Sequence, residues 1–131
     1  MGRNKQSLIY LDTHIVVWLY AGLIHKLTDV SKESIEKFDL WISQMVRLEL
    51  QYLYEIERIK VKPSKIIKSL SRSINLKISE SPLCDIIDES LKIDWTRDVF
   101  DRVLTAEASL QKSGFITADE TIRANYKQVI W

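Results

Sequence analysis

Five acidic residues follow or flank the apolar segments of this chain, and their spacing could place them at one cleft: Asp12, Glu49, Asp98, Asp101 and Asp119. Asp12 ends the first apolar run, and Asp119 stands shortly after a later one. Asp98 and Asp101 are three positions apart and would share one face of a helix. Like charges crowded at one cleft repel each other unless a cation neutralises them. Mg²⁺ or Mn²⁺, which prefer carboxylate and water oxygens, would do so.

The chemistry that this set favours is hydrolysis of a phosphodiester bond. A divalent ion held by carboxylates can acidify a bound water and stabilise charge on a phosphoryl oxygen. The chain has no paired Cys or suitably spaced His for zinc, and no evident Ser–His pair for nucleophilic catalysis. Its three glycines are too scattered for a phosphate-binding loop or a dinucleotide fingerprint.

Each acidic residue also has a simpler structural explanation. Asp12 and Asp98 could be helix N-caps, and Asp119 could be a turn residue. Glu49 and Asp101 could lie on solvated helix surface. His14, two positions after Asp12, could touch a substrate, or could cap a helix or lie on its surface.

The elements that must position these residues alternate between strand and helix patterns. Strands are predicted over residues 8–11, 40–43, 74–78, 115–117 and 128–131. Helices are predicted over residues 13–21, 31–38, 45–59, 64–70, 98–112 and 118–125, with a further one opened by Pro82. Gly114 is placed as a stop signal for the helix over 98–112. The alternation favours an α/β fold with a mainly parallel sheet, in which a ligand site lies at the carboxyl ends of the strands.

Length and composition are typical of one soluble domain. The chain has 131 residues, 46% of them hydrophobic and 28% charged, and 19 Lys+Arg against 18 Asp+Glu leave a net charge of +1. We expect one domain over residues 1–131, with residues 1–7 as a flexible extension. The single cysteine, Cys84, is expected to be a small buried apolar residue. No apolar stretch is long enough for a membrane span, which favours the cytoplasm.

The near-zero net charge conceals two opposed stretches. Residues 58–77 contain basic but no acidic side chains, whereas residues 80–101 are mainly acidic. The acidic stretch could contribute to the metal cleft, and the basic stretch could follow an RNA backbone through Lys62, Lys65 and Lys68. The alternative for the basic stretch is a solvated helix face with a lysine-rich loop. Among the tryptophans, Trp41 and Trp131 are expected in the core, and only Trp95 is considered for an exposed contact.

Several segments together resemble PIN-domain ribonucleases of the VapC toxin type. The resemblance runs from about Leu8 to Trp131 and keeps the order and spacing of the family. The segments that carry it are Leu11-Asp-Thr-His-Ile-Val-Val-Trp, the helix with Glu49, Arg97-Asp-Val-Phe-Asp-Arg, Ile116-Thr-Ala-Asp-Glu and the closing Val129-Ile-Trp.

The resemblance implies a three-layer α/β/α PIN-like domain that uses Mg²⁺ or Mn²⁺ to cleave RNA as an endoribonuclease. It implies catalytic and metal-binding roles for Asp12, Glu49, Asp101 and Asp119, and an additional metal-binding role for Asp98. Thr13 and Thr117 would be supporting hydroxyls that hold carboxylates or metal-bound water.

Two positions depart from the family pattern. Val99 stands where the family often has Pro, which affects the rigidity of the helix entry and not its acids. The subgroup often has an aromatic residue directly before the helix acid, whereas Leu48 precedes Glu49 here. A shift of one turn would nominate Glu55, although the spacing from Ser43 favours Glu49.

The resemblance also implies a homodimer and a cognate antitoxin, whose C-terminal segment would enter the acidic cleft. The leading hypothesis is therefore an endoribonuclease that acts as the toxin of a toxin–antitoxin pair. One alternative is a catalytically silent PIN-like module that binds RNA or a protein. Another is a nuclease for structured DNA, although the chain is short for the extra elements that would hold a duplex.

Overall fold

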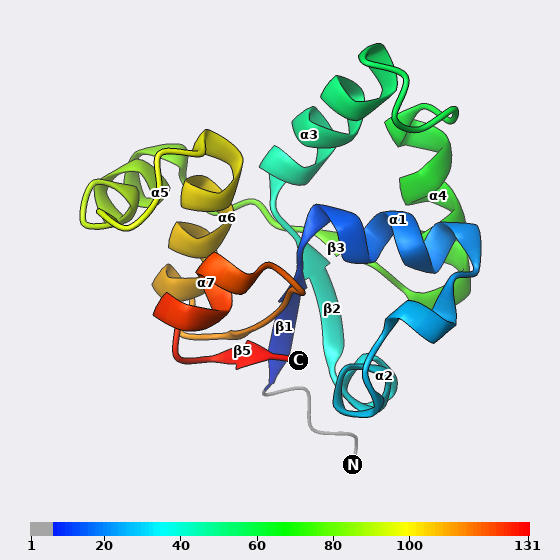
Figure 1. The fold of residues 1–131 in the computed structure, drawn as a ribbon, viewed down its shortest axis with the longest axis horizontal. Helices are drawn as coiled ribbons and strands as arrows, with labels where there is room; N and C mark the ends of the chain where they lie inside the picture. Colours follow the sequence, from blue (N-terminus) through cyan, green and yellow to red (C-terminus); the bar gives the residue numbers. More distant parts are fainter. Residues whose placement is uncertain (1–6) are drawn as a thin grey trace.

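A computed structural model describes residues 7–131, which form a five-stranded sheet with helices on both sides (Figure 1). The strands are β1 (Leu8–Leu11), β2 (Asp39–Ile42), β3 (Lys77–Ile78), β4 (Gly114–Ile116) and β5 (Val129–Ile130). All neighbouring strands are parallel, in the order β3-β2-β1-β4-β5. The predicted α/β class with a mainly parallel sheet is therefore confirmed.

Helices connect the strands by crossovers. They are α1 (Thr13–Ala21), the short 3₁₀ helix η1 (Ile24–Lys26), α2 (Asp29–Lys37), α3 (Gln44–Glu55), α4 (Pro63–Ile74), α5 (Leu83–Ser90), α6 (Val99–Leu110) and α7 (Glu120–Asn125). From β1 the chain adds β2 and then β3 on one side, through helices α1 to α4. It then crosses to the other side of β1 and adds β4 and β5, through helices α5 to α7. Right-handed crossovers therefore place these two groups on opposite faces of the sheet, which gives the three layers expected. Figure 1 shows α1, α2 and α4 on one side and α5, α6 and α7 on the other.

The two central strands supply much of the core. Leu11 of β1 and two neighbours on β4, Phe115 and Ile116, are almost fully buried. Strands covered on both faces in this way read as continuous apolar runs, as the sequence of β1 does. The register aligns Leu11 with Ile116 and Ile116 with Ile130, so these three strands end at the same level.

The end of α3 and the segment around β3 correct the predicted boundaries. The helix predicted over residues 45–59 ends at Glu55, because Glu57 adopts a left-handed backbone with φ of 62°. The strand predicted over residues 74–78 is limited to Lys77–Ile78, since α4 continues to Ile74 and ends where Asn75 turns left-handed. Ile66 and Leu70 are buried four positions apart, which is helical spacing, and α4 continues past its predicted end at residue 70 to Ile74.

The predicted role of Gly114 is also wrong. Helix α6 ends at Leu110, and the left-handed residue after it is Lys112, with φ of 53°. Gly114 instead begins β4, where a Cβ would lie 2.7 Å from Cδ1 of Ile130. The glycine lets β4 pack closely against the side chains of Ile130 on β5 and Ile9 on β1.

Two further predictions concern the surface. Cys84 is exposed on α5 and is not the buried apolar residue expected, because the buried face of this short helix presents Ile86 instead. Of the extension predicted over residues 1–7, only Ser7 lies within the described part, and its carbonyl accepts a hydrogen bond from the Asp39 amide. Within residues 7–131, no helix combines the length and apolar character needed to cross a membrane.

Candidate active site

Asp12 stands at the carboxyl end of the central strand β1 and is only 6% exposed. It is the N-cap of α1, where one carboxylate oxygen accepts a hydrogen bond from the Thr13 amide at 2.7 Å. The other oxygen accepts one from the Thr117 hydroxyl, which follows β4, at 2.5 Å. Burial raises the pKa of Asp12 most strongly, while these hydrogen bonds from Thr117 and Thr13 act in the opposite direction.

Glu49 reaches the same edge of the sheet from α3, the helix that follows β2. The hydroxyl of Thr13 donates a hydrogen bond to its Oε1 at 2.5 Å. Burial raises the pKa of Glu49, and the charges of Asp12 and Asp98 raise it further. Glu55, the alternative one turn later, instead accepts a hydrogen bond from Gln51 on the exposed side of α3. The structure therefore brings Glu49 to Asp12 and leaves Glu55 outside the cluster.

Asp101 has the strongest electrostatic signature of the site. Its pKa rises from 3.8 to about 7, first because of burial and then because four other carboxylates repel its charge: Asp98, Asp119, Asp12 and Glu49. The five acidic residues predicted from the sequence therefore interact electrostatically. We call this set of five residues the acidic cluster.

The capping interpretation is correct for Asp12 and Asp98, and Asp119, predicted as a turn residue, is a helix cap as well. Besides Asp12, Asp98 is the N-cap of α6 and accepts a hydrogen bond from the Asp101 amide at 2.9 Å. Asp119 is the N-cap of α7 and accepts one from the Ile122 amide at 2.9 Å. Capping and clustering are compatible, because the helices begin at the edge where the strands end.

The donor chemistry of the acidic cluster suits Mg²⁺ or Mn²⁺, since it consists of carboxylate oxygens whose mutual repulsion a cation would relieve. As the side chains stand, no three Asp, Glu, His or Cys residues within 7–131 form a group that could hold a metal ion. Asp98 and Asp119 each use only Oδ1 in their caps, and hydrogen bonds do not contribute to the pKa of Asp101. These three carboxylates therefore have oxygens available for an ion.

The two charged stretches differ in their relation to the acidic cluster. From the acidic stretch over residues 80–101, Asp101 has a raised pKa in the cluster, and Asp98 raises the pKa of Asp101 and of Glu49. Glu89, for example, pairs with Lys92 at 3.1 Å instead. The predicted RNA-binding lysines are exposed at the start of α4 and along it: Lys62, Lys65 and Lys68.

A buried polar network beside α6 was not predicted. Glu107 is 1% exposed, and its Oε2 accepts a hydrogen bond from the Tyr10 hydroxyl at 3.2 Å. The same hydroxyl lies 2.9 Å from Oγ of Ser79, which follows β3. The network links α6 to β1 and to the end of β3. Its one signal in the sequence is a glutamate between two alanines on an apolar helix stripe.

The tryptophans also differ from expectation. Trp95 is half-buried and packs against both hydrophobic clusters, so it is no exposed contact. Trp131, expected in the core, is half-buried against the core and also lines a surface pocket. Trp41 is half-buried against the core, with the Lys77 ammonium 5.7 Å from its ring centre.

Comparison with known proteins identifies the family. The model of the PIN domain matches residues 9–128, which is nearly the whole chain. The chain belongs to the PIN domain family. A search of curated proteins finds no match to this PIN domain.

Solved structures share the fold of this PIN domain. VapBC2 from Rickettsia felis, bound to a DNA fragment from its promoter, superposes with a TM-score of 0.65 at 17% identity. A toxin–antitoxin complex from Klebsiella pneumoniae gives a TM-score of 0.65 at 18% identity. Each comparison covers 94% of this chain and 96% of the other. At this identity the similarity establishes the fold.

Proposed function

We propose that this PIN domain is a metal-dependent endoribonuclease that acts as the toxin of a toxin–antitoxin pair. The observation that carries the proposal is the convergence of five carboxylates from four segments on one edge of the sheet. Its electrostatic consequence is the pKa of about 7 for Asp101. A protein that only folds has no need to keep these charges together, because their repulsion opposes folding at neutral pH.

Each member of the site has a role in this proposal. Asp101, Asp98 and Asp119 would hold Mg²⁺ or Mn²⁺, together with Asp12 and Glu49. The bound ion would acidify a water and stabilise charge on the phosphoryl oxygen.

The two threonines would act as positioning residues. The Thr117 hydroxyl holds the Asp12 carboxylate, and the Thr13 hydroxyl holds that of Glu49, so neither acid can turn away from the cleft. The exposed His14, whose charge lowers the pKa of both acids, would stand where substrate enters.

The toxin assignment rests on the VapC-type sequence segments and on the fold shared with two toxin–antitoxin structures. It includes a cognate antitoxin whose basic side chain would neutralise the acidic cluster. It also includes a homodimer and a cytoplasmic location. In support of a protein interface, α3 and the residue that caps it present apolar side chains to solvent at four-residue intervals: Leu48, Tyr52 and Ile56.

Incubation of the purified protein with total RNA and with DNA, in Mn²⁺ or in chelator, tests the activity. We expect cleavage of RNA only, and only with Mn²⁺. Asp12→Asn should abolish it, whereas the matched variant Asp88→Asn, in an exposed acid of α5, should retain it. Cleavage that survives both chelator and Asp12→Asn would refute the metal mechanism. For the toxin role, a small upstream reading frame that encodes a DNA-binding protein is the expected neighbour.

The alternative is a PIN-like module that binds RNA or a protein without cutting. It is favoured by one observation: the acidic side chains in the described range are not arranged as a metal-binding group as they stand. This module would bind RNA in the same assay and leave every substrate intact, with or without Mn²⁺.

A further inference from the structure

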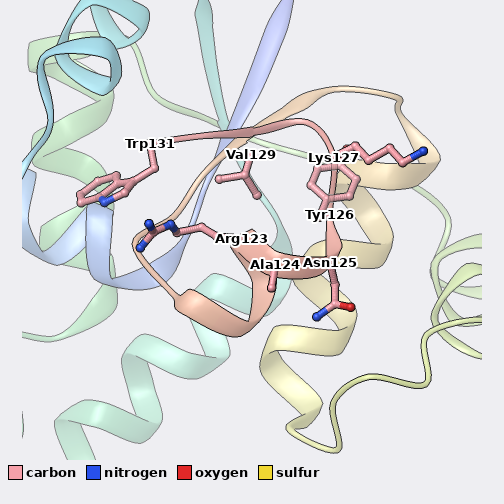
Figure 2. Close-up of a pocket in the computed structure, with 7 residues that line it drawn as sticks. All are labelled: Arg123, Ala124, Asn125, Tyr126, Lys127, Val129 and Trp131. Atoms are coloured by element: carbon pink, nitrogen blue, oxygen red, sulfur yellow. The ribbon is translucent and has the colours of Figure 1, made fainter.

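A surface pocket of about 380 Å³ lies between α7 and β5 (Figure 2). Its lining includes two cations, Arg123 and Lys127, together with Asn125 and the indole of Trp131. None of the described residues that line it is acidic. This composition contrasts with the acidic cluster and favours an anionic ligand that carries an aromatic group.

The register of the sheet places this pocket beside the acidic cluster. Ile130 aligns with Ile116, and Ile116 aligns with Leu11. The residues that follow these three, Trp131, Thr117 and Asp12, therefore stand at the same carboxyl edge. Strands lie about 4.8 Å apart, so Trp131 is about 10 Å from Asp12 across the sheet. A ligand strand lying along this edge would meet both.

Arg123 connects the pocket to the segment that precedes Asp119. Its guanidinium donates a hydrogen bond to the carbonyl of Ala118 at 3.4 Å, and Ala118 precedes Asp119. Figure 2 shows the Arg123 side chain extending towards the side of the pocket where the Trp131 indole lies. The cation thus stands between the indole and the loop that carries an acidic residue of the site.

A second aromatic ring lies beside the indole of Trp131. The rings of Trp131 and Trp18 are 6.2 Å apart, and the Lys26 ammonium lies 5.3 Å from the centre of the Trp18 ring. Both indoles are half-buried and keep part of their surface in solvent, while Lys26 and Arg123 are exposed. Cations alternating with aromatic faces are the elements with which proteins bind single-stranded nucleic acid.

We propose that the pocket between α7 and β5 binds a nucleotide of single-stranded RNA that flanks the bond to be cut. Its base would stack on Trp131, and its phosphate would contact Arg123. The inference rests on the proposed function, since it assigns a subsite to that substrate. The cations disfavour the alternative occupant, a basic protein segment of the kind that the acidic cluster would attract.

Binding of a fluorescein-labelled, single-stranded oligoadenylate tests the subsite by fluorescence anisotropy over a series of salt concentrations. All proteins carry Asp12→Asn so that the strand is not cut. Trp131→Leu keeps an apolar side chain but removes the stacking face, and should weaken affinity about tenfold. Trp131→Phe should restore most of it. Arg123→Ala should lower the slope of log affinity against log salt by about 0.7, the loss of one phosphate contact.

The matched control is Lys37→Ala, which removes an exposed cation from the last turn of α2, outside the basic stretch, and should leave the affinity and the slope unchanged. Thermal unfolding verifies that each variant is folded. Unchanged affinity in folded Trp131→Leu would overturn the proposal, as would an unchanged slope in Arg123→Ala.

The same proteins without Asp12→Asn separate this inference from the proposed function. If the protein cleaves RNA but its RNA affinity is unchanged by Trp131→Leu and by Arg123→Ala, the subsite alone is overturned. Binding of RNA through Trp131 without cleavage of any substrate would overturn the nuclease and leave the subsite standing.

Discussion

Replacing Asp101 by Asn should stabilise the protein at neutral pH. The ordinary pKa of this carboxyl is 3.8, and in the folded protein it is about 7. Between about pH 4 and 7 the folded state keeps a proton that the unfolded chain has released. The free energy of unfolding therefore falls as pH rises through this interval, and stays lowered above it. Asn carries no charge at any of these pH values and removes the effect.

The magnitude follows from the size of the shift. A difference of about three pKa units corresponds to about 4 kcal/mol when the group is wholly shielded from water. Asp101 is partly exposed, and solvent screens its repulsion by the other four carboxylates. We therefore expect Asp101→Asn to raise the free energy of unfolding by about 1–2 kcal/mol at about pH 8, and by almost nothing at about pH 4.

Urea unfolding of both proteins at the two pH values, without divalent ions, measures this difference. Asp88→Asn is the control, since Asp88 is exposed on α5 outside the acidic cluster. A gain for Asp101→Asn that is equal at both pH values, or absent at the higher one, would refute the electrostatic reasoning.

Three further predictions concern the support of the site, the sheet and the basic stretch. Thr117→Val should lower the free energy of unfolding by about 1–3 kcal/mol, because the buried Asp12 carboxylate loses a hydrogen-bond donor. Urea unfolding measures this loss, and the control Thr121→Val, at an exposed threonine, should lose far less. Equal losses in the two variants would contradict the assigned hydrogen bond. Gly114→Ala should cost about 1–3 kcal/mol through overlap with Ile130. The thermal unfolding temperature of Gly114→Ala should recover partly when Ile130→Val is added. No recovery would show that the overlap is not with Ile130. Replacing Lys62, Lys65 and Lys68 together with Gln should lower the slope of log RNA affinity against log salt by about 2. An unchanged slope would exclude these three lysines as phosphate contacts.

The acidic cluster could be predicted because its members are tied to element ends. Asp12 follows an apolar run that can only be a buried strand, and Asp98 and Asp101 share a helix turn. The parallel sheet then brings these ends to one edge, as the geometry around Thr117 shows. What the sequence could not distinguish was capping from clustering, because both require an acid at the same position and the structure contains both.

Other features depend on packing across long separations in the sequence. Helix α4 runs past its predicted end at residue 70 to Ile74, with Ile66 and Leu70 buried in the core, so the strand predicted over residues 74–78 is limited to Lys77–Ile78. Gly114 was assigned to a helix end, but its reason is a contact with Ile130, which is distant in the chain. Trp131, expected in the core, packs against the core but leaves its ring half-buried beside a surface pocket.

Calorimetric titration of the protein with Mn²⁺ tests the central claim, that the acidic cluster is a metal site. We expect saturable binding at about pH 8 that weakens towards about pH 5, since Asp101 is protonated below about 7 and must release its proton to bind. Asp101→Asn should weaken binding strongly, whereas Asp88→Asn should not. Absence of binding by the wild-type protein, or equal affinity in Asp101→Asn, would contradict the account.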